Sequence, residues 1–264
     1  MGHVAALVMA LALLASPVGF VQAHDVNGAF SEQGGIADAG LTSWAVLGLR
    51  AAGATAPGSL AYLQSQEATL MATPSIALAA LAEESLGAQP TALLQKLTAA
   101  EKPDGEIGPT LNATFWAVLA LGRSSVATTR FVLAHQAASG GWSWDVGVQP
   151  DSNDTAAALE ALRVAGVHGA PIDRAVKYLL RFENADGGFA LSKGDTSDSQ
   201  STAWAIQGLL AAGRTPPKAA FAYLARMRRS DGSYRYSAQY VTNPVWVTSQ
   251  VLAALARKPF PFVS

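Results

Sequence analysis

Cysteine is absent from this chain of 264 residues. Its absence excludes disulfide bonds, thiolate zinc ligands, a cysteine nucleophile and an internal thioester. Histidine is nearly as scarce beyond the N-terminal segment: His24 lies at the expected mature N-terminus, His135 in an expected outer helix and His168 in a turn. Such scattered imidazoles predict no metal site and no cofactor. Packing must therefore stabilise the fold.

Charge is also sparse, because only 14% of the residues are charged whereas 50% are hydrophobic. The formal net charge is −1 and no basic cluster stands out. Nucleic acid is therefore not an expected partner. A composition of this kind predicts a globular domain with a large core and not a disordered chain.

The N-terminal segment is almost wholly apolar over residues 4–21 and ends in Val21-Gln22-Ala23. Small residues at this spacing are typical of a signal-peptidase site. Residues 1–23 are predicted to be a secretory signal, and residues 24–264 a single domain that is secreted or held in the cell envelope, without a membrane span. Because no Lys or Arg precedes the apolar stretch, an uncleaved membrane anchor is the alternative.

An internal repeat is the main signal in the rest of the chain. Its unit is an apolar first helix led by Thr or Ser, a Gly or Pro break, a second helix and an Asp-Gly loop. Two successive copies show it best, with first helices from Asp154 and Ser201 and loops at 186–189 and 231–234. About six first helices and five second helices recur every 32–47 residues or so, as in arrays of helical hairpins.

Local chemistry supports these helices. Thr, Ser, Asp or Asn precedes each first helix as an expected N-cap, and Gly53, Gly166 and Gly213 stand where a left-handed C-terminal residue is needed. Prolines open the second helices, where the first turn accepts them.

The two kinds of helix differ in polarity. First helices are apolar nearly all round, whereas the second helix at 171–183 carries charges on one face. An apolar inner ring inside an amphipathic outer ring predicts an all-α fold, an α/α toroid of about six helical hairpins. A straight solenoid is the competing arrangement. One first helix lacks a partner, which predicts a seam where the chain ends meet.

Three loops share a spaced motif, of which the clearest copy is Phe131-Val132, Gln136 and Gly140-Gly141-Trp142. The motif resembles the QW repeat of squalene-hopene and oxidosqualene cyclases. The chain is thus similar to the prenyltransferase/squalene-oxidase repeat family, and the resemblance implies its terpene cyclase-like toroid. In that family the QW elements are structural, which implies a stabilising role for Gln136, Trp142, Phe189 and Tyr234.

The segment Asp151-Ser152-Asn153-Asp154-Thr155-Ala156 is similar to the Asp-x-Asp-Asp-Thr-Ala motif with which class II terpene cyclases protonate their substrate. The resemblance places the general acid at Asn153. Because an amide has no acidic proton to give, such chemistry would have to pass to Asp151 or Asp154. The next repeat has a similar segment at 198–203, which favours a helix-start role for both.

In a toroid, the loops before the inner helices gather at one mouth. Aromatic and acidic side chains there suit a ligand site, and the candidate ligand-binding residues are Trp142, Trp144, Asp145, Asp198, Trp204, Tyr234 and Tyr236. Trp44, Trp116, Trp204 and Trp246 recur early in inner helices. They either line the cavity or pack between hairpins, and packing is favoured because Ala157 fills the same repeat position.

Two functions stay open. The favoured prediction is a non-catalytic binding or scaffold module for a small hydrophobic ligand or a surface protein, with docking at the seam as a variant. The alternative is a terpene (squalene) cyclase-like isomerase, in which Asp151 or Asp154 starts carbocation chemistry on an isoprenoid and aromatic faces stabilise the cation. Asn153, the single barrel and the expected export count against the enzyme.

Overall fold

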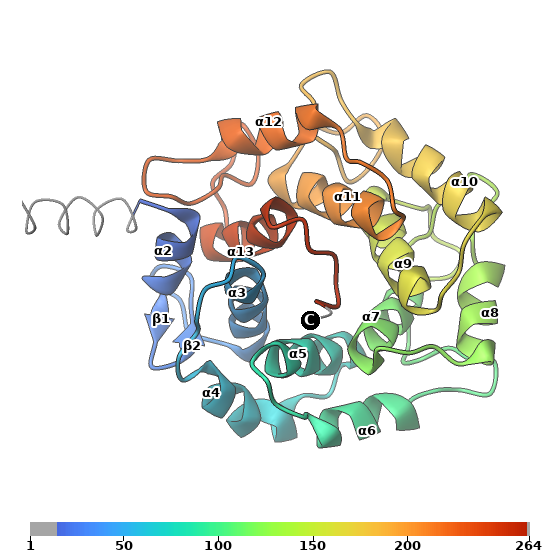
Figure 1. Ribbon diagram of the computed structural model, residues 1–264, viewed down its shortest axis with the longest axis horizontal. Helices are drawn as coiled ribbons and strands as arrows, with labels where there is room; N and C mark the ends of the chain where they lie inside the picture. Colours follow the sequence, from blue (N-terminus) through green and yellow to red (C-terminus); the bar gives the residue numbers. More distant parts are fainter. Residues whose placement is uncertain (1–14, 263–264) are drawn as a thin grey trace, which may run out of the picture.

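Two concentric rings of helices make up the computed structural model, which describes residues 15–262 (Figure 1). The inner ring consists of α3 (Ala39–Ala51), α5 (Thr73–Ser85), α7 (Leu111–Leu121), α9 (Ser152–Val164), α11 (Ser199–Ala211) and α13 (Pro244–Leu255). The outer ring consists of α4 (Ser59–Gln66), α6 (Thr91–Ala99), α8 (Val126–Ala134), α10 (Ala170–Leu179) and α12 (Lys218–Met227). Short 3₁₀ turns, η1 (Glu67–Thr69) and η2 (Leu180–Phe182), extend α4 and α10.

The inner ring is closed. Each inner helix packs against the next, and α13 packs against α3. At this seam a Cβ on Gly48 would stand 2.4 Å from the backbone oxygen of Ser249, so the two backbones are in direct contact. The predicted α/α toroid is confirmed, and the straight solenoid is wrong because its first and last inner helices would lie apart.

The outer helices bury one face against the inner ring, as their amphipathic sequences predict. In α10, Ile172, Ala175 and Leu179 are buried whereas Asp173 and Lys177 face the solvent. The hydrophobic core therefore lies mainly between the rings, and the inner helices form the wall of the barrel interior.

The segment before α3 completes the outer ring. It contains α2 (Pro17–Gln22) and a hairpin of β1 (Asp25–Val26) and β2 (Ala29–Phe30). Helix α2 packs against α13, the inner helix that lacked a partner, and Val21 is fully buried. Residues 15–23 of the predicted signal thus belong to the folded ring, while residues 1–14 lie outside the described part. No helix within residues 15–262 is long and apolar enough to cross a membrane.

A repeated hydrogen bond ties five of the six inner helices to a loop that precedes them. The backbone N–H of the last loop residues donates to a threonine Oγ1 at 2.9–3.0 Å in the pairs Phe30–Thr42, Ile107–Thr114, Trp142–Thr155, Phe189–Thr202 and Tyr234–Thr248. These threonines give five inner helices a common register. Two residues after each of them, the side chain points into the barrel: Trp44, Trp116, Ala157, Trp204 and Gln250.

Most helix ends have the predicted caps. Asp38, Thr110, Asp151 and Asp198 cap four inner helices with their side chains, and Gly53, Gly166 and Gly213 have left-handed backbones with φ of 76°, 68° and 68°. The prediction is wrong for α5, which begins after Ala72. At α13 the side chain of Asn243 makes no capping bond. Glu32 instead accepts the N–H groups of Val245 and Trp246 across the seam.

Gln136 joins neighbouring outer helices. Its Nε2 donates to the backbone oxygens of Gly140 and Pro171, each at 2.8 Å, and its Oε1 accepts a hydrogen bond from Arg174. Pro171 lies in the first turn of α10, so the side chain links the end of α8 to the start of the next outer helix. The contacts agree with the structural role that the QW resemblance implies.

Candidate functional site

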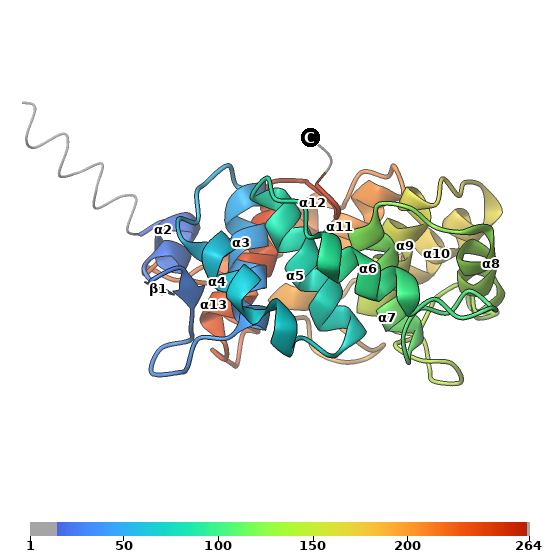
Figure 2. The same cartoon turned by 90° about the horizontal axis from the view of Figure 1, so that it is seen from below.

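A cavity of about 370 Å³ opens at the end of the barrel where the inner helices begin. The long loops gather on this face, and the C-terminal segment lies on the opposite one (Figure 2). We call it the mouth cavity. Its lining residues are Trp44, Asn112, Trp116, Trp144, Asp151, Asn153, Asp154, Ala157, Leu191, Gln200 and Trp204.

The threonine register explains which polar side chains reach the cavity. Two residues before the threonine, α7, α9 and α11 carry the amides Asn112, Asn153 and Gln200. One residue before it, α9 carries Asp154, whereas the other four helices of this register carry Leu41, Ala113, Ser201 and Val247. Among these five described helices, only α9 therefore places a carboxyl at this level.

Asp154 is only 7% exposed and is held by two polar neighbours. Its backbone N–H donates to Oδ1 of Asp151 at 2.8 Å, and the Nδ2 of Asn112 donates to its Oδ1 at 2.5 Å. Asp151 is the N-cap of α9, so the two carboxyl groups share one helix start.

Burial, followed by the charge of Asp151 and a hydrogen bond with it, raises the pKa of Asp154 from 3.8 to about 8. The hydrogen bond from Asn112 opposes this rise. Burial also raises the pKa of Asp151, against the hydrogen bonds that it accepts. At neutral pH the Asp154 carboxyl therefore holds a proton, which makes it an acid within reach of the cavity.

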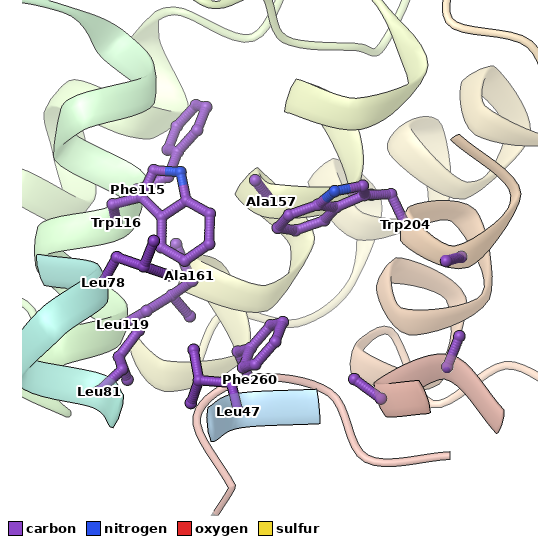
Figure 3. Close-up of a cluster of buried hydrophobic side chains, with 14 of the residues drawn as sticks. Leu47, Leu78, Leu81, Phe115, Trp116, Leu119, Ala157, Ala161, Trp204 and Phe260 are labelled. Carbon is purple, nitrogen blue, oxygen red and sulfur yellow. The ribbon is translucent and has the colours of Figure 1, made fainter. Parts of the chain in front are cut away.

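Three tryptophans form the floor of the mouth cavity, and we call them the Trp triad: Trp44, Trp116 and Trp204. Their ring centroids lie 5.5, 5.6 and 6.1 Å apart in edge-to-face pairs. The indole N–H of Trp204 donates to Oε1 of Gln250 at 2.9 Å. Because α9 has Ala157 at this level, space remains on its side of the barrel, which Trp116 and Trp204 also face (Figure 3).

Four residues singled out in the sequence meet in this cavity with inner-helix tryptophans: Asp151, Asn153, Asp154 and Trp144. Of the four recurring tryptophans, Trp44, Trp116 and Trp204 line it and Trp246 does not. Trp144 is 51% exposed at the rim, and its backbone oxygen accepts the N–H of Asn112 at 2.9 Å. The rim loop is thereby fixed to the start of α7.

The other candidate ligand residues lie elsewhere. Trp142 is fully buried and donates its indole N–H to the backbone oxygen of Val132 at 2.8 Å, so it belongs to the core. Tyr234 is likewise buried, and Asp198 caps α11. Asp145 and Tyr236 are half-buried in loops but do not line the mouth cavity.

Asn112, Gln200 and Leu191 are lining residues that sequence reasoning missed. Two of them carry a readable signal, because Asn112 and Gln200 precede their threonines by two residues just as Asn153 does. Aligning the repeats on threonine would have found both. Leu191 lies in an irregular loop where no periodicity applies.

No group of three or more His, Asp or Glu side chains within residues 15–262 is arranged to hold a metal ion. The chemistry that the described residues of the cavity offer is that of a protonated carboxyl above aromatic rings.

No family model and no curated protein matches the chain. Solved structures do. A protein from Actinoplanes has a TM-score of 0.72 at 16% identity, covering 93% of this chain and 98% of its own. A variant of the type II terpene cyclase MstE from Scytonema, in complex with its substrate geranylgeranyl dihydroxybenzoate, has a TM-score of 0.64 at 15% identity, with coverages of 93% and 97%.

The ent-copalyl diphosphate synthase from Streptomyces platensis is similar with a TM-score of 0.57 at 21% identity, over 84% of this chain and 51% of the synthase. At these identities the likeness concerns the fold alone. It confirms what the closed double ring and the QW-like loops indicate: the chain has the prenyltransferase and terpene cyclase-like α/α-toroid fold.

Proposed function

We propose that the protein is an acid-initiated isoprenoid cyclase of the class II terpene cyclase type, with Asp154 as its proton donor. The observation that carries this proposal is the buried Asp154 carboxyl, whose pKa of about 8 keeps it protonated beside a cavity floored by the Trp triad. The proposal favours the enzyme over the non-catalytic module that the sequence analysis preferred, because solved structures with this fold include isoprenoid cyclases.

The reaction needs no redox partner. The Asp154 proton adds to one carbon of a terminal alkene, whose π electrons form the new C–H bond and leave a tertiary cation. A second alkene of the same chain attacks that cation and forms the ring carbon–carbon bond. Loss of a proton to the Asp154 carboxylate then ends the reaction, so that the product is an isomer of the substrate and the acid is restored.

Each neighbour has a part in this scheme. Asn112 orients the Asp154 carboxyl through its hydrogen bond. Asp151 raises the proton affinity of Asp154 and fixes the start of α9. The faces and edges of the Trp triad surround the site of the cation, and aromatic faces attract cations.

Asn153 occupies the place of the family's acid, and the role passes to the next residue. The two positions differ in solvation, because Asn153 is half-buried whereas Asp154 is buried. A carboxyl in the drier position keeps its proton more readily.

The test is to incubate the protein with geraniol, farnesol, geranylgeraniol and squalene and to identify cyclic isomers by mass spectrometry. We expect Asp154→Asn to lower turnover by about 10²–10⁴-fold, the usual contribution of a positioned acid. Asp173→Asn, on the outer face of α10, serves as the matched control. No product from any substrate, or full turnover by the Asp154 variant, would contradict the proposal.

Isoprenoid binding without turnover is the second candidate function. Asn153 favours it, as does the filled lower half of the barrel described below. This second function predicts that an isoprenoid binds equally well to the wild type and to Asp154→Asn, and that neither protein forms an isomer. For either function, the apolar N-terminal segment supports the further proposal that the chain is exported.

A further inference from the structure

The C-terminal tail, residues 257–262, leaves α13 and turns into the centre of the barrel (Figure 1). It enters from the face opposite the mouth cavity (Figure 2). Phe260 is only 1% exposed there. A segment at the end of the chain thus occupies the barrel axis.

Phe260 supports the Trp triad from this side. Its ring centroid lies 6.0 Å from that of Trp44, 6.3 Å from Trp116 and 6.2 Å from Trp204. Figure 3 shows Phe260 beneath the rings of Trp116 and Trp204, near Leu47 and Leu119 from the inner helices. The floor of the mouth cavity is therefore two layers thick, and Phe260 is the lower layer.

Two polar side chains of α9 hold the tail in place. Oε1 of Glu160 accepts the backbone N–H of Phe260 at 2.8 Å. Nη2 of Arg163 donates to the backbone oxygens of Phe260 at 2.7 Å and of Pro261 at 3.3 Å. Glu160 is fully buried, and its other oxygen has no hydrogen-bond partner among the described residues.

A buried carboxyl in an apolar wall costs free energy unless it is bonded, and the tail is the group to which Glu160 is bonded. The inner ring itself closes through helix-to-helix packing without the tail. The tail therefore fills the lower part of the barrel, and Glu160 and Arg163 of α9 hold its backbone there.

We propose that the tail is a stopper that limits the length of the isoprenoid chain, with Phe260 as the specificity-determining residue. The inference rests on the proposed isoprenoid ligand. It adds that this protein selects short chains, because the lower half of its barrel is occupied.

The rise of an α-helix gives the depth at which Phe260 lies below Asp154. Glu160, which holds Phe260, follows Asp154 by six residues of α9, or about 9 Å of helix. One isoprene unit extends by roughly 5 Å, since it contributes four carbon atoms with bonds of about 1.5 Å to the chain. This depth equals the length of about two units. The Trp triad, level with Ala157 midway along it, closes the barrel above Phe260, and Phe260 supports the triad from below. Val164, the last residue of α9, follows Asp154 by ten residues, or about 15 Å, so about three units would fit once the tail is gone and the triad can move down.

The test compares the binding of geraniol, farnesol and geranylgeraniol, measured by native mass spectrometry and by tryptophan fluorescence. The variants are Phe260→Ala, the milder Phe260→Leu, and a chain ending at Pro259. The matched control is Phe262→Ala, because Phe262 stacks on Phe260 with centroids 4.8 Å apart but makes no ring contact with the Trp triad. Circular dichroism checks that each variant folds.

We expect the wild type and Phe262→Ala to prefer geraniol. Phe260→Ala and the shortened chain should shift the ratio of the dissociation constants for geraniol and geranylgeraniol by at least about tenfold toward the longer chain, and Phe260→Leu by less. If Phe260→Ala does not fold, the shift in Phe260→Leu decides.

Unchanged length preference in the folded variants would overturn the inference, as would a wild type that already prefers geranylgeraniol. A shift in binding without turnover in any variant would support the stopper and reject the cyclase. Turnover that depends on Asp154, together with an unchanged preference for chain length, would support the cyclase and reject the stopper. Absence of binding by every variant would overturn both.

Discussion

Asp154→Asn should change how the stability of the protein depends on pH. The pKa of this carboxyl is raised from 3.8 to about 8 in the fold, so between these values the folded state binds a proton that the unfolded chain releases. The stability that this proton contributes is fully present below about pH 4 and is lost as the pH rises through about 8. The asparagine variant has no such proton to lose.

The magnitude follows from the size of the shift. At about 1.4 kcal/mol per pKa unit, a rise from 3.8 to about 8 sets a ceiling of about 6 kcal/mol. About three of these roughly four units lie above pH 5. Between about pH 5 and pH 9, the free energy of unfolding should therefore fall by up to about 4 kcal/mol more in the wild type than in Asp154→Asn.

Urea denaturation followed by far-UV circular dichroism at the two pH values measures this difference. Glu160 and Asp198 also have raised pKa values, of about 8 and about 6, caused first by burial. The wild type should therefore lose stability with rising pH for several reasons, and only the difference between variants isolates Asp154. Asp173→Asn, about half exposed, should follow the wild type. An equal fall in all three proteins would refute the reasoning, because Asp154 would then be ionised at neutral pH and unable to donate a proton.

Two further predictions concern the ring. Thr202→Val leaves the buried N–H of Phe189 without its acceptor and should lower the free energy of unfolding by about 1–3 kcal/mol in urea denaturation; the exposed Thr98→Val should not. Deleting residues 1–23 removes α2 and the buried Val21 and should cost about 2–4 kcal/mol relative to deleting residues 1–14. Equal stability of the two deletion proteins would mean that the ring does not need α2 and would favour cleavage after Ala23.

The ring of hairpins could be predicted from the sequence because its signals are local. N-caps, left-handed glycines and hydrophobic periodicity each concern residues within a few turns of one helix. Helix α2 illustrates the limit of such signals. A stretch that packs beside α13 is as apolar as a signal peptide, and hydropathy alone does not separate the two uses.

The site could be predicted only in part, for two physical reasons. Residues Trp142 and Trp144 lie two apart in one loop, yet the first is fully buried in the core and the second stands at the rim. Backbone conformation in the loop decides this, and aromatic composition does not reveal it. The place of Phe260 could not be predicted because Glu160, which accepts its backbone N–H, lies 100 positions away in the chain. No repeat or motif marks such a pairing.

Two successive inner helices begin with an aspartate cap, but only the first of them carries a second carboxyl group next to that cap. Asp151 and Asp198 cap α9 and α11 in the same way, and the helix dipole favours their ionised forms. In α11 the residue three positions later is Ser201, and burial raises the pKa of Asp198 only to about 6. In α9 that position is Asp154, so a second carboxyl enters the same dry space and its pKa reaches about 8. Like charges at short distance cannot both ionise cheaply. The acid of α9 thus depends first on the burial of Asp154 and second on its pairing with Asp151, and asparagine at position 153 leaves that proton source in place.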